Sequence, residues 1–185
     1  MTKSVHNFRP RKFLNGWRIA GWGSLLALLM LPAIAMQFTT EVGWTGSDFV
    51  FAAVLLSFLG GAVEFAVHGA RRTPARVAIV VTALAVFLTL WANGAVGIIG
   101  DEGEPVNFGF TVLALGAVAA AAVTRLRVRP MQVVTAVIAV SQIVMGFVGM
   151  LTMPGHAVEW GVLAVFALIW GGASWFFDRA ARMAA

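Results

Sequence analysis

The chain of 185 residues carries a formal net charge of +5 and has no cysteine; 60% of its residues are hydrophobic and only 11% are charged. A soluble domain carries roughly 25% charged residues and could not bury this much apolar surface, so the composition indicates an integral membrane protein. The lack of cysteine excludes disulfides, thiolate catalysis and cysteine-ligated metal or iron–sulfur sites.

Apolar stretches long enough to cross a bilayer recur along the chain. A helix needs about 20 apolar residues to cross about 30 Å of hydrocarbon. We therefore expect an all-α fold, a six-helix membrane bundle. It would be flanked by a basic N-terminal tail at 1–15 and a C-terminal tail at 178–185. The first stretch is as long as the later ones, so we interpret it as a span rather than a cleaved signal peptide. The predicted spans are 16–36, 49–68, 77–98, 107–124, 131–152 and 158–177.

The placement of charge sets the topology. The fourth span is the shortest, so five spans with a partly inserted fourth segment is the alternative. With six spans, all 13 Lys and Arg residues fall on one side, which the positive-inside rule makes the cytoplasm. The opposite loops hold acids but no Lys or Arg, a separation that five spans would break. The basic clusters are Lys3, Arg9, Arg11, Lys12 and Arg18; Arg71, Arg72 and Arg76; Arg125, Arg127 and Arg129; and Arg179 and Arg182.

Each span that returns from the outer side opens on a similar segment. Residues 48–51, 107–110 and 159–162 begin with an acid or amide and continue with an aromatic residue. Gly60-Gly61-Ala62 and Gly171-Gly172-Ala173 follow their opening acids at the same distance. One interpretation is three repeated helical hairpins. The other is that caps and interfacial aromatics are common at such helix starts, so that similarity arises without duplication.

Polar side chains inside spans are candidates for function because they are costly there. Glu64 lies well inside the second span, with His68 at i+4 on the same helical face. The pair predicts a proton relay or, alternatively, a structural pair near the membrane surface. Asn93 and Gln142 are amides at membrane depth. We favour hydrogen bonding between helices for both over the lining of a solute path.

The predicted outer loop 100–107 concentrates Asp101, Glu102 and Glu104 between glycines and a proline. Carboxylates this close together could hold a hard cation such as Ca²⁺ or gather cations at a channel mouth. Their spacing does not follow the EF-hand pattern. A solvated acidic loop is the simpler interpretation.

Residues 36–49 and 91–107 resemble segments of a family of small multi-spanning bacterial inner-membrane proteins of uncharacterised function. The acidic loop departs from the family pattern at Gly103-Glu104. The resemblance implies a bacterial inner-membrane location and a shared site near the periplasmic face, but no activity. The residues that it would place there are Gln37, Glu41, Trp44, Asp48, Asn93, Glu102 and Asn107.

The leading hypothesis is binding or transport of a small solute, ion or lipid through an outer acidic-aromatic vestibule. The alternatives are an accessory subunit that docks on a larger membrane complex or on a second copy, and a lipid-modifying enzyme with paired carboxylates. Familiar catalytic motifs are missing, so we favour a non-enzymatic role. No cofactor is expected, and the partners are the bilayer and not nucleic acid. The candidate residues are Glu41, Trp44, Asp48, Glu64, His68, Asn93, Asp101, Glu102, Asn107 and Gln142.

Overall fold

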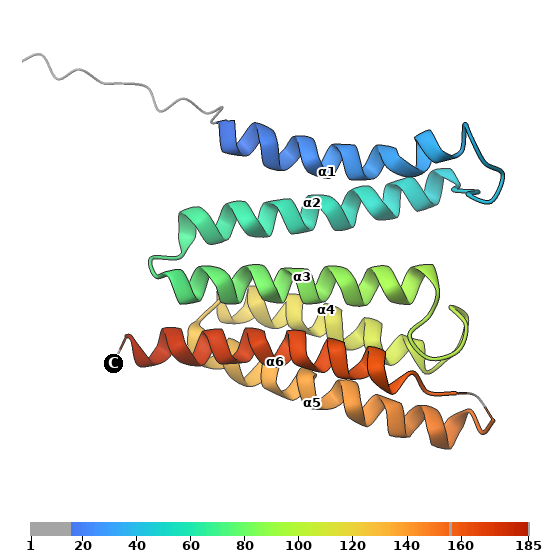
Figure 1. The fold of residues 1–185 in the computed structure, drawn as a ribbon. Coiled ribbons are helices and arrows are strands. Elements are labelled where there is room, and N and C mark those ends of the chain that lie inside the picture. Colours follow the sequence, from blue (N-terminus) through green and yellow to red (C-terminus); the bar gives the residue numbers. More distant parts are fainter. Residues whose placement is uncertain (1–15, 156, 185) are drawn as a thin grey trace, which may run out of the picture. The chain divides into compact units, whose positions relative to one another are not determined.

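The computed structural model describes residues 16–155 and 157–184, so the predicted tail at 1–15 lies outside the described residues, as do His156 and Ala185. Within the described residues, the regular structure consists of six α-helices, each long and apolar enough to span a membrane (Figure 1). The predicted six-span, all-α membrane protein is confirmed. The helices are α1 (Gly16–Ala35), α2 (Gly46–Gly69), α3 (Thr73–Ala95), α4 (Asn107–Thr124), α5 (Val128–Thr152) and α6 (Trp160–Arg182).

Helix ends follow local chemistry more closely than hydropathy. α3 begins at Thr73, before the predicted span, because Pro74 suits the first helical turn. It ends at Ala95 because Gly97 adopts a φ of 77°, a left-handed conformation that a helix cannot include. α6 continues past the predicted span to Arg182. The bounds of α4 agree with the prediction at both ends.

The chain divides into two compact units, the first ending at Phe49 and the second beginning at Val50. In the first unit, α1 contains no buried residue. Several of its large apolar side chains, among them Trp17, Leu26 and Leu31, are more than half exposed. A helix that is apolar on every face and unburied is suited to lipid contact.

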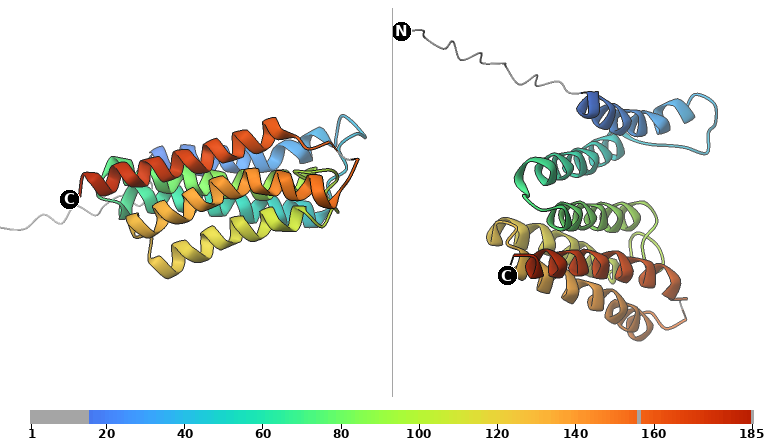
Figure 2. Two further views of the ribbon diagram at one scale, coloured as in Figure 1. Left: turned by 90° about the horizontal axis from the view of Figure 1, so that it is seen from below. Right: turned by 60° about the vertical axis from the view of Figure 1, so that its left-hand side comes forward.

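In the second unit, α3 to α6 form a closed ring of four helices. α3 packs against α4 and α6, and α5 packs against the same two helices. Figure 2 shows these four helices side by side, with sequence neighbours running in opposite directions. This is the up-down-up-down arrangement of a four-helix bundle.

The bundle core has three layers along its length. One layer, at the end that carries the acidic loop 96–106, is built around Phe110 and Phe166. The middle layer surrounds Trp170. The third layer surrounds Met131 and Phe177, at the end that carries the loops 70–72 and 125–127. We call these ends the acidic end and the basic end of the second unit.

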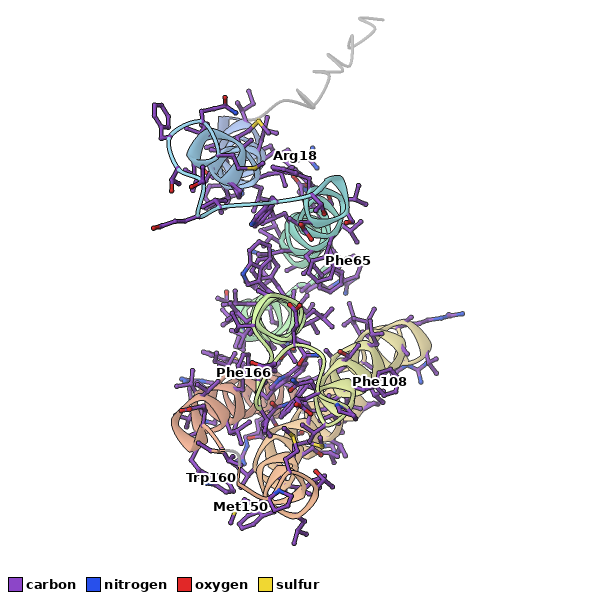
Figure 3. All side chains as sticks on the ribbon, turned by 90° about the vertical axis from the view of Figure 1, so that its right-hand side faces the viewer. Arg18, Phe65, Phe108, Met150, Trp160 and Phe166 are labelled. Atoms are coloured by element: carbon purple, nitrogen blue, oxygen red, sulfur yellow. The ribbon has the colours of Figure 1, made fainter. Side chains whose placement is uncertain are left out.

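α2 is held against the bundle by aromatic side chains. Phe51, Phe58 and Phe65 recur every seven residues and therefore lie along one helical face. The Phe51 ring lies against Gly94 of α3, where an added Cβ would be 3.1 Å from it. Phe58 packs on the middle layer, and Phe65 lies between the ribbons of α2 and α3 (Figure 3). Rings of this size leave space between α2 and its neighbours.

Candidate functional site

Three predicted site residues, Glu41, Trp44 and Asp48, belong to the first unit. The Asp48 carboxylate accepts hydrogen bonds from the backbone N–H of Thr45 at 2.6 Å and from its hydroxyl at 2.8 Å. Trp44 packs edge-on against Phe49, with ring centroids 5.2 Å apart. Asp48 therefore caps α2, and the pattern Thr45-x-x-Asp48 is the sequence signal that indicates this start. Glu41 is exposed.

Asn107 organises the acidic loop. It is only 2% exposed, and its amide oxygen accepts hydrogen bonds from the backbone N–H groups of Ile98 at 3.2 Å and Ile99 at 3.0 Å. Its amide nitrogen donates to the carbonyl oxygens of Ile99 at 3.1 Å and Asp101 at 2.8 Å. Both donor hydrogens and both acceptor positions are thereby used. Asn107 acts here on the protein's own backbone.

The same loop closes the acidic end of the bundle. Ile98, Ile99 and Val106 are buried in the layer around Phe110. The tight return requires Gly97, where a Cβ would be 2.6 Å from the carbonyl carbon of Asp101. Asp101 and Glu102 are exposed, so these carboxylates lie on the outside of a plug of apolar side chains. Cation binding by the acidic loop stays a prediction.

Asn93 connects two helices. Its amide nitrogen donates to the carbonyl oxygen of Asn107 at 2.9 Å and to the Thr111 hydroxyl at 2.8 Å, which ties α3 to α4. Gln142 is fully buried in α5, and neither of its amide atoms has a hydrogen-bond partner among the described residues. The buried Thr89 hydroxyl and Trp170 indole N–H are unpaired in the same sense. The structure thus gives Asn93 an interhelical bond and gives Gln142 none.

Glu64 and His68 lie together on α2. The His68 Nδ1 donates to the backbone carbonyl oxygen of Glu64 at 2.8 Å and lies 3.7 Å from its carboxylate. The side chains are 23% exposed for Glu64 and 62% exposed for His68. This geometry suits a structural pair at the basic end of α2 and also a proton relay, so the relay stays a prediction.

A groove that the sequence analysis did not predict lies between α2, α3 and α4. It has a volume of about 370 Å³ and runs from the middle of these helices toward their basic end, where Leu126 of the loop after α4 lines it. Its walls are almost entirely apolar. Ser57 and Thr82 contribute hydroxyl groups to the lining, and the Thr82 hydroxyl already donates to the Ala78 carbonyl oxygen at 2.8 Å. We call it the apolar groove. It is lined by residues that include Ser57, Gly61 and Phe65 of α2, Ala83 and Val86 of α3, and Ala117 and Ala121 of α4.

A second hollow, of about 270 Å³, adjoins this groove at the basic end. It is lined by Arg71 and Arg72 from the loop between α2 and α3 and by Arg125 from the corner between α4 and α5, and we call it the basic hollow. None of the described residues that line it is acidic. In the sequence, these arginines indicate topology and give no sign of a site. The residues that line both the groove and the hollow are Phe65, Ile79 and Leu126.

The corner after α4 has an unusual backbone. Arg125 and Leu126 have φ values of 51° and 54°, in the left-handed region that glycine normally occupies. The backbone N–H of Leu126 donates to the Ala121 carbonyl oxygen at 2.9 Å and so closes the helix end. Each non-glycine residue in this conformation costs roughly 1–2 kcal/mol. The corner presents Arg125 to the basic hollow and Leu126 to both spaces.

The described residues do not bring metal ligands together. Within 16–155 and 157–184, no group of three or more His, Asp or Glu side chains is placed where it could hold a metal ion. Asp48 caps α2, Glu64 and His68 lie together on α2, and Asp178 binds Arg182 on α6 and accepts a hydrogen bond from Gln132 of α5 at 3.2 Å.

Comparisons with known proteins give no relative from which a role could be transferred. No protein-family model, no curated protein and no solved structure matches the chain.

Proposed function

We propose that this polytopic membrane protein binds a membrane lipid without catalysing a reaction on it. An acyl chain of the lipid would occupy the apolar groove, which we call the lipid groove from here on. One observation carries the proposal: the groove is apolar and lies along three membrane-spanning helices, from their middle toward the basic end. A space at that depth, open to the side, faces hydrocarbon and not water. A lipid chain is the ligand that reaches it directly.

The size and walls of the groove favour a retained lipid over passing contact with the bilayer. Its volume falls in the range of about 300–1,000 Å³ that is usual for small-ligand sites. Three helices contribute to the wall, and the rings of Phe58 and Phe65 line it. A chain enclosed in this way gains close contacts with many protein atoms, which the mobile chains of the bilayer do not offer.

Binding of a lipid, unlike entry of a solute through the outer vestibule, does not require the acidic end of the bundle to open. A solute that entered from that end would first have to displace Ile98 and Ile99, which are buried and held by Asn107. A chain that enters the lipid groove sideways meets no such barrier. The outer vestibule, with Glu41, Asp48 and Asp101 as its acids, stays a prediction.

A docking role is the second candidate. A Cβ added at Gly171 or Gly172 of α6 would meet no other atom within 4 Å. The neighbouring Leu168 and Trp175 are 74% and 53% exposed. Small residues beside exposed apolar ones allow a second helix to approach closely in a membrane. A partner helix on this face is compatible with a lipid in the groove.

Filling the groove tests the proposal. Gly61 lines the groove, and a Cβ there would meet nothing within 4 Å, so the side chain of Gly61→Phe can leave the backbone freely and place its ring at the groove. We expect retained lipid to fall about tenfold or more, the effect of losing at least about 1.4 kcal/mol of binding. The measurement is native mass spectrometry of the gently solubilised full chain.

Gly116→Phe is the matched control. Gly116 is also a helical glycine with open space around its Cβ, but it does not line the groove. Both changes replace glycine by a better helix former, so neither should weaken its helix. Equal lipid retention by the two variants and the unaltered protein would contradict the proposal. Loss of a protein partner in Gly172→Phe would instead support docking.

A further inference from the structure

The arginines of the basic hollow have no acidic partner in the described part of the chain. Two acids lie near this end of the second unit. Glu64 lies 3.7 Å from His68, and Asp178 binds Arg182 at 2.7 Å and accepts a hydrogen bond from Gln132 at 3.2 Å. These three arginines are exposed, and guanidinium groups that line one space attract an anion to it. The hollow therefore fits a negatively charged ligand group.

The neighbouring lipid groove indicates which kind of molecule carries this negatively charged group. The hollow lies at the ends of α2, α4 and α6, at the level of lipid head groups, whereas the groove lies along the hydrocarbon part of α2, α3 and α4. A phospholipid has the same order of parts, with a phosphate at the interface and acyl chains below it. Basic pockets between membrane helices are typical sites for anionic head groups.

We infer that the basic hollow holds the phosphate of an anionic glycerophospholipid whose acyl chain lies in the lipid groove. The inference rests on the proposed lipid-binding function and adds the chemical class of the lipid. Arginine suits this role because its planar guanidinium donates two parallel hydrogen bonds to a phosphate. A zwitterionic lipid fits less well, since its own ammonium group offsets the phosphate charge.

The strained corner supports the same assignment. Arg125 and Leu126 both adopt left-handed conformations, and this backbone presents one side chain to the basic hollow and the next to both spaces. Conformations of this kind cluster at ligand clamps, where the surrounding structure maintains them. Here the corner joins the site for the head group to the site for the chain.

Competition between two lipids tests the inference. The full chain is reconstituted in vesicles that contain equal amounts of phosphatidylglycerol and phosphatidylcholine with identical acyl chains, and lipids retained after release are counted by native mass spectrometry. We expect the protein to retain phosphatidylglycerol preferentially. In the double variant Arg71→Gln/Arg125→Gln the preference should fall about tenfold or more, since each arginine near a membrane surface adds substantially to anionic-lipid binding.

The double variant Arg127→Gln/Arg129→Gln is the matched control. It removes the same charge from the same end of the unit, but these two arginines line a different hollow beside Pro130 and Ala181. It should keep the preference for phosphatidylglycerol. Equal loss in both double variants would overturn the inference, because diffuse positive charge would then explain the selectivity. Loss in neither variant would overturn it too.

The remaining outcomes separate this inference from the proposed function. If the unaltered protein retains lipid, and Gly61→Phe loses it, but no preference for phosphatidylglycerol exists, the inference fails and lipid binding stands. If the unaltered protein retains no lipid, both fail. Displacement of phosphatidylglycerol by inorganic phosphate would overturn the assignment to a lipid. A lipid-free dimer that Gly61→Phe dissociates would show that a second copy fills the groove.

Discussion

Asn107 illustrates how one side chain determines the form of a loop. Four hydrogen bonds join its amide to the backbone of residues 98–101, and Asn93 binds its carbonyl oxygen. The sequence identified both amides as candidates near the outer face. It could not show that Asn107 serves the chain's own backbone, because the partners lie in an irregular loop with no periodic pattern. Gln142 is fully buried, and its amide has no hydrogen-bond partner among the described residues. A packing role and a place on a solute path both stay predictions for it.

Replacing Asn107 should destabilise the acidic end. Asn107→Ala leaves the buried N–H groups of Ile98 and Ile99 without acceptors. Each unsatisfied buried group costs about 1–3 kcal/mol. We expect a loss of about 3 kcal/mol, seen as a lower thermal unfolding midpoint in detergent. Glu102→Ala, an exposed change in the same loop, should leave the midpoint unchanged. An unaltered midpoint in Asn107→Ala would show that the loop does not depend on this amide.

The corner between α4 and α5 shows where element-scale prediction from sequence succeeds and where it fails. Hydropathy places the end of α4 correctly at Thr124, since the apolar run ends there. It gives no sign that Arg125 and Leu126 are left-handed, because neither is glycine or asparagine. Similarly, the start of α2 follows from the Thr45–Asp48 capping pair and not from its apolar residues.

Arg125→Gly should separate the two roles of this corner. Glycine adopts a φ of 51° without strain, so the variant should be more stable by about 1 kcal/mol. The same variant removes a guanidinium from the basic hollow and should lose selectivity for phosphatidylglycerol. Thermal unfolding and lipid competition measure the two effects. Arg127→Gly is the control, because Arg127 has a φ of −61° and gains nothing from glycine. Destabilisation of Arg125→Gly would contradict the strain argument.

At the scale of the whole molecule, topology brings separate basic clusters to one place. Arg71 and Arg125 lie on different loops, yet both line the basic hollow because an even number of crossings returns the chain to the same end. The hollow is therefore a consequence of helix number as well as of local sequence. The positive-inside rule would place it at the cytoplasmic leaflet.

Labelling of single cysteines tests that orientation. The chain has no cysteine, so Glu102→Cys and Arg127→Cys each introduce a unique thiol. A membrane-impermeant maleimide should label Glu102→Cys in intact cells and Arg127→Cys only after permeabilisation. The reverse labelling pattern would show that the protein has the opposite orientation and that the basic hollow lies at the outer leaflet. Labelling of both sites in intact cells would contradict the predicted number of spans between them.

The sequence by itself determined that this is a membrane protein, where its six helices lie, and which loops share a side. Hydropathy and charge suffice for this. The length of an apolar run determines whether it can span the membrane, and the charge of a loop determines on which side of the membrane the loop lies. The tertiary structure decided which helix faces meet, and with that the plug of Ile98 and Ile99, the lipid groove and the basic hollow. In a membrane, the inward and outward faces of a helix are both apolar, so the 3.6-residue pattern that orients a helix in water is weak here.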